Sequence, residues 1–141
     1  MIAIRLLAAL LCLVALFAPS CVLLDACKEC KAATVELFSA VDEQDFEAIE
    51  RLMGRSITFK LDKLRLAETF SEIHNELGAC DAPRILSIDC TTDTSGTQAR
   101  MSVRAPCTEG DGRAELVWKV NRGTPKLESF SFLREIANSS K

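Results

Sequence analysis

The sequence predicts an α+β fold, in which two to three helices come first along the chain and pack on a four-stranded antiparallel sheet. Two observations lead to this prediction. Before residue 80 the apolar residues recur with a helical period, and after Pro83 they alternate with polar residues, as in a half-buried strand. The length of 141 residues fits a single domain. Helices followed by strands, without alternation, indicate a helical layer on one face of a sheet.

The first two helices are expected over residues 29–44 and 46–53. Asp45 stands between them, where its carboxylate can cap the second helix. Gly54 is then in place to end that helix. The apolar stripes are Ala33, Leu37, Phe38 and Val41 in the first helix, and Phe46, Ile49, Leu52 and Met53 in the second.

A third helix is expected to begin after Asp62, which can cap it, and to stop at Gly78. Its apolar stripe is Leu66, Phe70, Ile73 and Leu77. Between the second and third helices, residues 56–61 alternate apolar and polar side chains. This short alternation predicts a strand or an extended link.

Four alternating runs follow Pro83, and Gly-containing turns separate them at residues 95–96, 110–112 and 122–125. Short turns between alternating runs predict an antiparallel meander with one apolar face. The apolar positions are Leu86, Ile88 and Cys90; Met101, Val103 and Ala105; Ala114, Leu116, Trp118 and Val120; and Phe130 and Phe132.

The first hairpin also bears on disulfide pairing. If residues 95–96 form a two-residue loop, Arg84 lies opposite Cys107. Cys80 comes shortly before Arg84, so Cys80–Cys107 is the favoured bridge. In the same register Cys90 faces Met101 and points into the core, where a cysteine usually serves as an inert small apolar side chain.

The N-terminus predicts export. Arg5 precedes an apolar run over residues 6–18, which is typical of a secretory signal peptide. As a helix this run is about 20 Å long, which is shorter than the ~30 Å core of a bilayer. The following residues, Ala18-Pro19-Ser20-Cys21, resemble the lipobox of bacterial lipoproteins. That resemblance implies cleavage before Cys21 and lipidation of this residue, on the periplasmic face of a bacterial membrane.

Two alternatives to lipidation remain open. One is ordinary cleavage, which would give a soluble secreted protein. The other is an uncleaved anchor, since the apolar character continues to Leu24. The expected organisation is a signal peptide at 1–20, a tether at 21–31, a folded domain at 32–134 and a flexible tail at 135–141. The net charge of −3 gives no support to nucleic-acid binding. An acidic domain is repelled by anionic membranes, so attachment is expected through the lipid or the apolar segment.

The chain has seven cysteines, and in an oxidising compartment such a set indicates disulfides. Cys27 and Cys30 form a C-x-x-C pair, which three hypotheses explain. Thiol–disulfide exchange would need a preceding strand, and zinc would need a second such pair or paired histidines, whereas His74 is the only histidine. The third hypothesis is that one or both cysteines bridge the N-terminal arm to the domain.

The order of elements resembles the nuclear transport factor 2-like superfamily, whose fold is a cystatin-like α+β cone. The resemblance covers residues 30–133 and is carried by the 37–49 segment, LFSAVDEQDFEAI, and by the strand around Trp118 and Lys119. It implies a curved sheet that, together with the helices, encloses a cone. Enzymes of this superfamily place Asp, His and Tyr inside the cone. This chain has no Tyr.

The expected function is therefore a small binding or accessory module of the bacterial envelope, without catalysis. Trp118, Phe130 and Phe132 are the candidate floor of a ligand pocket, unless they are plain core. The expected partner is a small apolar ligand or an envelope protein, and no cofactor or metal is expected. The alternative is an acid–base enzyme that uses His74 with Asp42.

Arg100, Arg104, Arg113 and Lys119 fall on the polar face of the predicted sheet, where they could form an anion-binding strip. Glu115 on the same face favours mixed, solvated charge instead.

Overall fold

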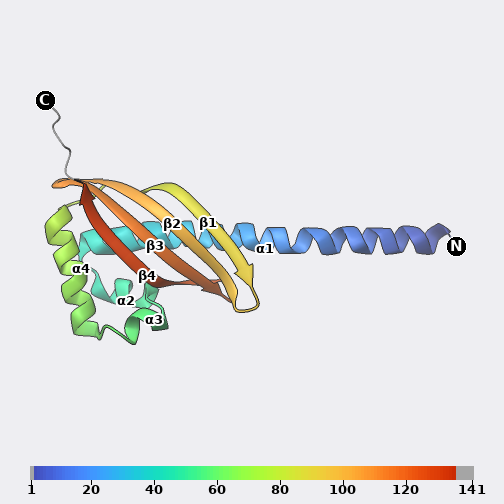
Figure 1. Cartoon of the computed structure of the whole chain (residues 1–141), viewed down its shortest axis with the longest axis horizontal. Helices are drawn as coiled ribbons and strands as arrows, with labels where there is room; N and C mark the ends of the chain where they lie inside the picture. Colours follow the sequence, from blue (N-terminus) through green and yellow to red (C-terminus); the bar gives the residue numbers. More distant parts are fainter. Residues whose placement is uncertain (1, 136–141) are drawn as a thin grey trace, which may run out of the picture.

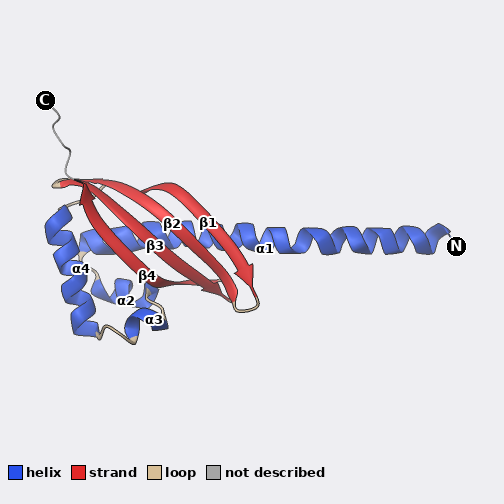
Figure 2. Ribbon diagram, in the orientation of Figure 1, coloured by secondary structure: helices blue, strands red, loops and turns tan. Residues whose placement is uncertain are grey.

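The structure is a computed structural model that describes the backbone of residues 2–135 and side chains from residue 23 onward. The helices are α1 (Ile2–Glu43), α2 (Phe46–Leu52), α3 (Arg55–Thr58) and α4 (Lys63–Leu77). The strands are β1 (Arg84–Asp93), β2 (Gly96–Cys107), β3 (Gly110–Asn121) and β4 (Thr124–Glu135), and they form one antiparallel sheet in chain order. The sheet curves across the second half of α1, while α2, α3 and α4 lie toward the β4 side (Figures 1 and 2). The α+β class and the four-stranded meander are confirmed.

Asp45, Asp62 and Gly78 cap their helices as the sequence predicts, whereas Gly54 is the N-cap of α3 and Met53 is the C-cap of α2. The Asp45 carboxylate accepts a hydrogen bond from the N–H of Ala48, at 3.1 Å, and begins α2. The Asp62 carboxylate accepts one from the N–H of Arg65, at 2.8 Å, and begins α4. Gly78 ends α4 with a φ of 71°, a backbone conformation that residues with a Cβ rarely adopt.

The prediction of a strand or extended link at residues 56–61 is wrong, because this segment contains the single-turn helix α3. The turn begins at Gly54, whose carbonyl accepts hydrogen bonds from Ile57 and Thr58. It buries Ile57 and leaves Phe59 exposed. An alternation of three apolar residues is too short to distinguish a strand from one helical turn.

Helix α1 begins far earlier than residue 29 and is continuous from Ile2 through the expected tether. Its first half projects beyond the sheet, whereas Ala26 and Cys30 are buried against the domain (Figure 1). The side chains of the predicted signal peptide and of Cys21 lie outside the described residues. The predicted tail lies outside them too, apart from Glu135. Among the side chains that are described, no helix is apolar for long enough to cross a membrane.

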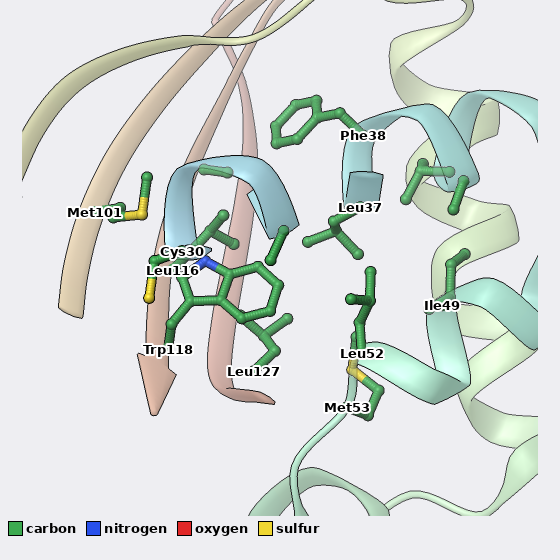
Figure 3. Close-up of a cluster of buried hydrophobic side chains, with 14 of the residues drawn as sticks. Cys30, Leu37, Phe38, Ile49, Leu52, Met53, Met101, Leu116, Trp118 and Leu127 are labelled. Atoms are coloured by element: carbon green, nitrogen blue, oxygen red, sulfur yellow. The ribbon is translucent and has the colours of Figure 1, made fainter. Parts of the chain in front are cut away.

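The core lies between α1 and the inner face of the sheet (Figure 3). Trp118 is fully buried at its centre. Its Nε1–H donates to Thr34 Oγ1 at 3.0 Å, and the Thr34 hydroxyl donates to the carbonyl of Cys30 at 2.8 Å. These bonds satisfy both polar side chains, which would otherwise destabilise the core. The inner face of the sheet carries alternate residues of β2 and β3: Ala99, Met101, Val103, Ala105, Ala114, Leu116, Trp118 and Val120.

The predicted register of the first hairpin is wrong by two residues. The structure pairs Asp93 with Gly96 and Cys90 with Ala99, and a bulge follows between Ile85 and Ser87. The turn is set by Asp93, whose carboxylate accepts hydrogen bonds from the hydroxyl and the N–H of Ser95, at 2.6 and 2.7 Å. These bonds also lower the pKa of Asp93. Such an Asx turn moves the loop back to residues 94–95.

Cys80 is nevertheless bonded to Cys107, the bridge that the sequence favours. The reason differs from the one predicted, since Arg84 lies opposite Arg104 instead of Cys107. Residues 79–81 pair directly with the end of β2: the N–H of Thr108 donates to Ala79 at 3.0 Å, and the N–H of Asp81 donates to Pro106 at 2.8 Å.

A second disulfide joins Cys27 on α1 to Cys90 on β1. The expectation that Cys90 is an inert core thiol is therefore wrong, because the register places Cys90 at the edge of the core, beneath α1. Cys30 is the remaining described cysteine, and it is free and buried. The staple interpretation of the C-x-x-C pair thus holds for Cys27 alone.

We expect the Cys27–Cys90 bridge to stabilise the fold strongly because it closes a loop with a sequence separation of 63. In the chain-entropy description, the double variant Cys27→Ala/Cys90→Ala loses about 4 kcal/mol of unfolding free energy. Urea unfolding measures this loss. The matched control Cys30→Ala removes a buried sulfur but no bridge, and should cost about 1 kcal/mol. Equal losses in the two variants would contradict the role of the bridge.

Candidate functional site

His74 and Asp42 line the same small cavity. Asp42 comes from the last turn of α1 and His74 from the last turn of α4, and Phe38, Cys80 and Phe132 complete most of the wall. The cavity volume is about 10 Å³, which is close to the space needed for one water molecule. The sequence offered this pair as the only acid–base candidate, and the packing of α4 against α1 brings the two residues together.

Asp42 has a structural partner. Its Oδ1 accepts a hydrogen bond from the backbone N–H of Cys80 at 3.0 Å, across a sequence separation of 38 residues. This bond ties the end of α1 to the connection between α4 and β1. On the other side, Asp42 faces an open groove of about 260 Å³ that also includes Val35 and Pro83. Asp42 therefore stands between the small cavity and this groove.

His74 is half-buried, and its Nδ1 is buried with no hydrogen-bond partner among the described residues. An imidazole nitrogen in this position can donate one proton to a molecule in the cavity or accept one from it. The space admits a water molecule but no substrate group beside it. Acid–base chemistry on a substrate would therefore require Phe38 or Phe132 to move.

The three aromatic residues predicted to floor a ligand pocket have different positions. Trp118 is plain core. Phe132 lines the His74 cavity, whereas Phe130 lines a separate hollow beside α3. Phe130 and Phe132 also pack against Phe70, with ring centroids 4.9 and 6.1 Å away. The apolar stripe thus fills the interior and does not form one pocket.

The cysteines are not arranged for thiol–disulfide exchange within the C-x-x-C pair, because Cys27 is bonded to Cys90. Burial, together with the negative charge of Glu29, raises the pKa of the Cys30 thiol to about 11. The nucleophile in such exchange is the thiolate, which is scarce at neutral pH when the pKa is this high. Among the described residues, no group of three or more metal-ligating side chains is present.

The polar face of the sheet carries paired charges. Arg104 pairs with Asp111, and Arg113 Nη1 lies 3.0 Å from Glu135 Oε1. The hydroxyl of Ser102 donates to Glu115 at 2.8 Å. Carboxylates thus pair with Arg104 and Arg113, two of the four cations of the predicted strip, and this mixture of charges resembles an ordinary solvated surface more than an anion site.

A groove that the sequence did not predict lies at the end of the sheet opposite to the His74 cavity. Its volume is about 460 Å³, and it runs between α1 and the turns of the two outer hairpins. Ala26 and Val120 supply apolar walls, and Asp25, Glu29 and Arg122 supply charges. The Cys27–Cys90 bridge and the register of the sheet bring the two turns next to the start of the domain. No short pattern in the sequence predicts this proximity.

The fold is similar to solved structures of nuclear transport factor 2-like proteins. A candidate dehydratase of this family from Streptomyces avermitilis matches with a TM-score of 0.54 and 10% identity, over 79% of this chain and 97% of that chain. A candidate aromatic ring hydroxylase from Novosphingobium aromaticivorans matches with a TM-score of 0.50 and 13% identity, over 77% and 87%. No protein-family model matches the sequence, and no curated protein does. The chain therefore has the nuclear transport factor 2-like fold that its resemblance predicts. Sequence identities this low support similarity of fold and nothing beyond it.

If Asp42 is structural, Asp42→Ala should lower the free energy of unfolding by about 1–3 kcal/mol, because the Cys80 N–H loses its acceptor. Asp42→Asn keeps an oxygen acceptor and should cost less than half as much. Urea unfolding measures the loss in both variants. The control is Glu43→Ala, which removes a carboxylate from the neighbouring exposed residue. A loss that is equal in the Ala and Asn variants would show that charge, and not this hydrogen bond, is what matters.

We expect Cys30 to react slowly with iodoacetamide in the native protein. With a pKa of about 11, the thiolate fraction at pH 8 is about a hundredfold below that of an unperturbed cysteine, and it rises about tenfold per pH unit up to that pKa. Mass spectrometry of the native and the urea-unfolded protein measures the two rates. Rapid native labelling, or recovery of a Cys27–Cys30 bridge in the trapped protein, would revive thiol–disulfide exchange.

Proposed function

We propose that this protein is an exported, lipid-anchored accessory module of the bacterial envelope that binds a small ligand or an envelope protein without catalysing a reaction. The observation that carries the proposal is the filled interior. Trp118, Phe70, Leu37 and Met101 occupy the space between helices and sheet, and the cavity that His74 and Asp42 line admits about one water molecule.

Export has two supports. The N-terminal pattern is typical of a signal peptide followed by a lipobox-like cysteine, Cys21. The two disulfides, Cys27–Cys90 and Cys80–Cys107, belong to a kind of crosslink that forms and persists in oxidising compartments.

Ligand binding has a candidate place in the groove between α1 and the hairpin turns. Its volume of about 460 Å³ lies in the range of small-molecule sites, which is about 300–1,000 Å³. Apolar walls at Ala26 and Val120, with charges at Asp25 and Arg122, suit a small ligand that is apolar in its body and polar at one end.

The second candidate function is acid–base catalysis, because His74 and a carboxylate share a cavity. Two solved neighbours are candidate enzymes, a dehydratase and a ring hydroxylase, but their identities of 10% and 13% extend no further than the fold. This function requires the cavity to open widely around His74, whereas the binding function uses the structure as it stands.

Intact mass spectrometry of the protein from the host envelope tests this proposal. We expect a mature chain that begins at Cys21, carries acyl mass on that residue and contains two oxidised cysteine pairs. The variant Cys21→Ser should lose the acyl mass, with Cys30→Ser as the matched control that keeps it. An unprocessed, reduced chain would contradict export, and a processed chain without acyl mass would contradict the anchor alone.

A further inference from the structure

The connection between α3 and α4 carries a concentrated group of exposed apolar and basic side chains. Phe59 is 94% exposed and Leu64 is 69% exposed, the former being the most exposed of the large apolar residues in the described part of the chain. The exposed cations around them are Arg55, Lys60, Lys63 and Arg65. We call these six residues the α3–α4 patch. It lies at the lower edge of the molecule in Figure 1.

The local charge of the patch is opposite to that of the chain. Residues 55–65 contain four cations and one acid, whereas the whole chain has a net charge of −3. The acid is Asp62, whose carboxylate is engaged as the cap of α4. Lys63 Nζ also lies 3.4 Å from Glu50 Oε2, in an exposed ion pair that contributes little to stability. With Glu50 counted, the patch is still net positive.

We propose that the α3–α4 patch docks the domain on the surface of a bilayer that carries anionic headgroups. The charge on the rest of the chain does not prevent this, because salt screens charges that lie more than about 8 Å apart at physiological ionic strength. The domain as a whole is acidic, but the surface that touches the headgroups is basic. The inference goes beyond the proposed function and holds whether or not Cys21 carries a lipid.

The apolar residues favour a bilayer over an acidic protein as the partner. A protruding phenyl ring gains little from a protein surface unless that surface offers a fitted pocket. The interface of a bilayer accepts an exposed Phe and Leu without a complementary shape, and basic residues beside them add electrostatic attraction. The patch has both components in one short connection.

Fluorescence quenching in the full chain tests the docking. Phe59→Trp adds an indole at the patch, while Trp118 is fully buried and supplies a constant background. The vesicles contain brominated phosphatidylcholine, either alone or mixed with phosphatidylglycerol. We expect the added indole to be quenched on the anionic vesicles only, and high salt to abolish the quenching. The N-terminal segment is identical in all the variants, so a difference between variants reports the patch and not the insertion of this segment.

Charge reversal supplies the matched comparison, made in the Phe59→Trp background. Each cation near an anionic surface contributes a factor of about five, and the two new carboxylates are repelled by the same surface. Lys60→Glu/Lys63→Glu should therefore require at least about 25-fold more anionic lipid for half-maximal quenching. This variant should fold, because both positions are exposed and a Glu in the first turn of α4 is favourable. The control Arg84→Glu/Arg134→Glu changes the same charge on exposed strand residues and should keep the quenching.

Two results would overturn the proposal. One is equal quenching on both kinds of vesicle, and the other is no quenching on either. In the second case, binding to polyglutamate that depends on Lys60 and Lys63 would identify an acidic protein surface as the partner. None of these results affects the mass-spectrometric test of export and lipidation.

Discussion

The orientation of α1 on the sheet depends on one short chain of buried hydrogen bonds. Trp118 brings an indole N–H into the centre of the core, where an unpartnered donor costs about 1–3 kcal/mol. Thr34 accepts this bond, and its own hydroxyl donates a hydrogen bond to the carbonyl of Cys30 one turn earlier. Only one rotation of α1 places Thr34 beneath the indole, so the bonds fix which face of the helix meets the sheet.

The rest of the structure follows from that rotation. One α-helical face presents Cys27, Cys30, Thr34, Leu37 and Val41 at spacings of three and four residues. Once Thr34 is fixed, Cys27 lies over β1 and meets Cys90, while the far end of the helix brings Asp42 to the N–H of Cys80. Covalent and polar contacts therefore hold both ends of the packed segment, and the apolar core fills the space between them.

Sequence reasoning succeeded where the deciding forces are local. Asp45 and Asp62 predict their helices because a cap acts within three residues, and strand alternation predicts the meander because it reflects burial on one face. It failed where another interaction competes. The Asx turn at Asp93 shifted the hairpin register, and one helical turn at Gly54 replaced the expected strand. The Cys27–Cys90 bridge and the His74 cavity depend on how α1 and α4 pack, which no short pattern in the sequence records.

A filled cone changes where this fold can meet other molecules. The superfamily's interior is available for chemistry only if side chains leave room, and here Trp118 and the phenylalanines around Phe70 take that room. The same packing that stabilises the domain thus leaves about 10 Å³ in the cavity that His74 and Asp42 line. The contacts that we propose with a ligand and with a bilayer lie at the ends of the elements, in the groove beside Asp25 and at the connection that carries Phe59. Residues at these ends can change with little effect on the core, so one rigid body can support different surface functions.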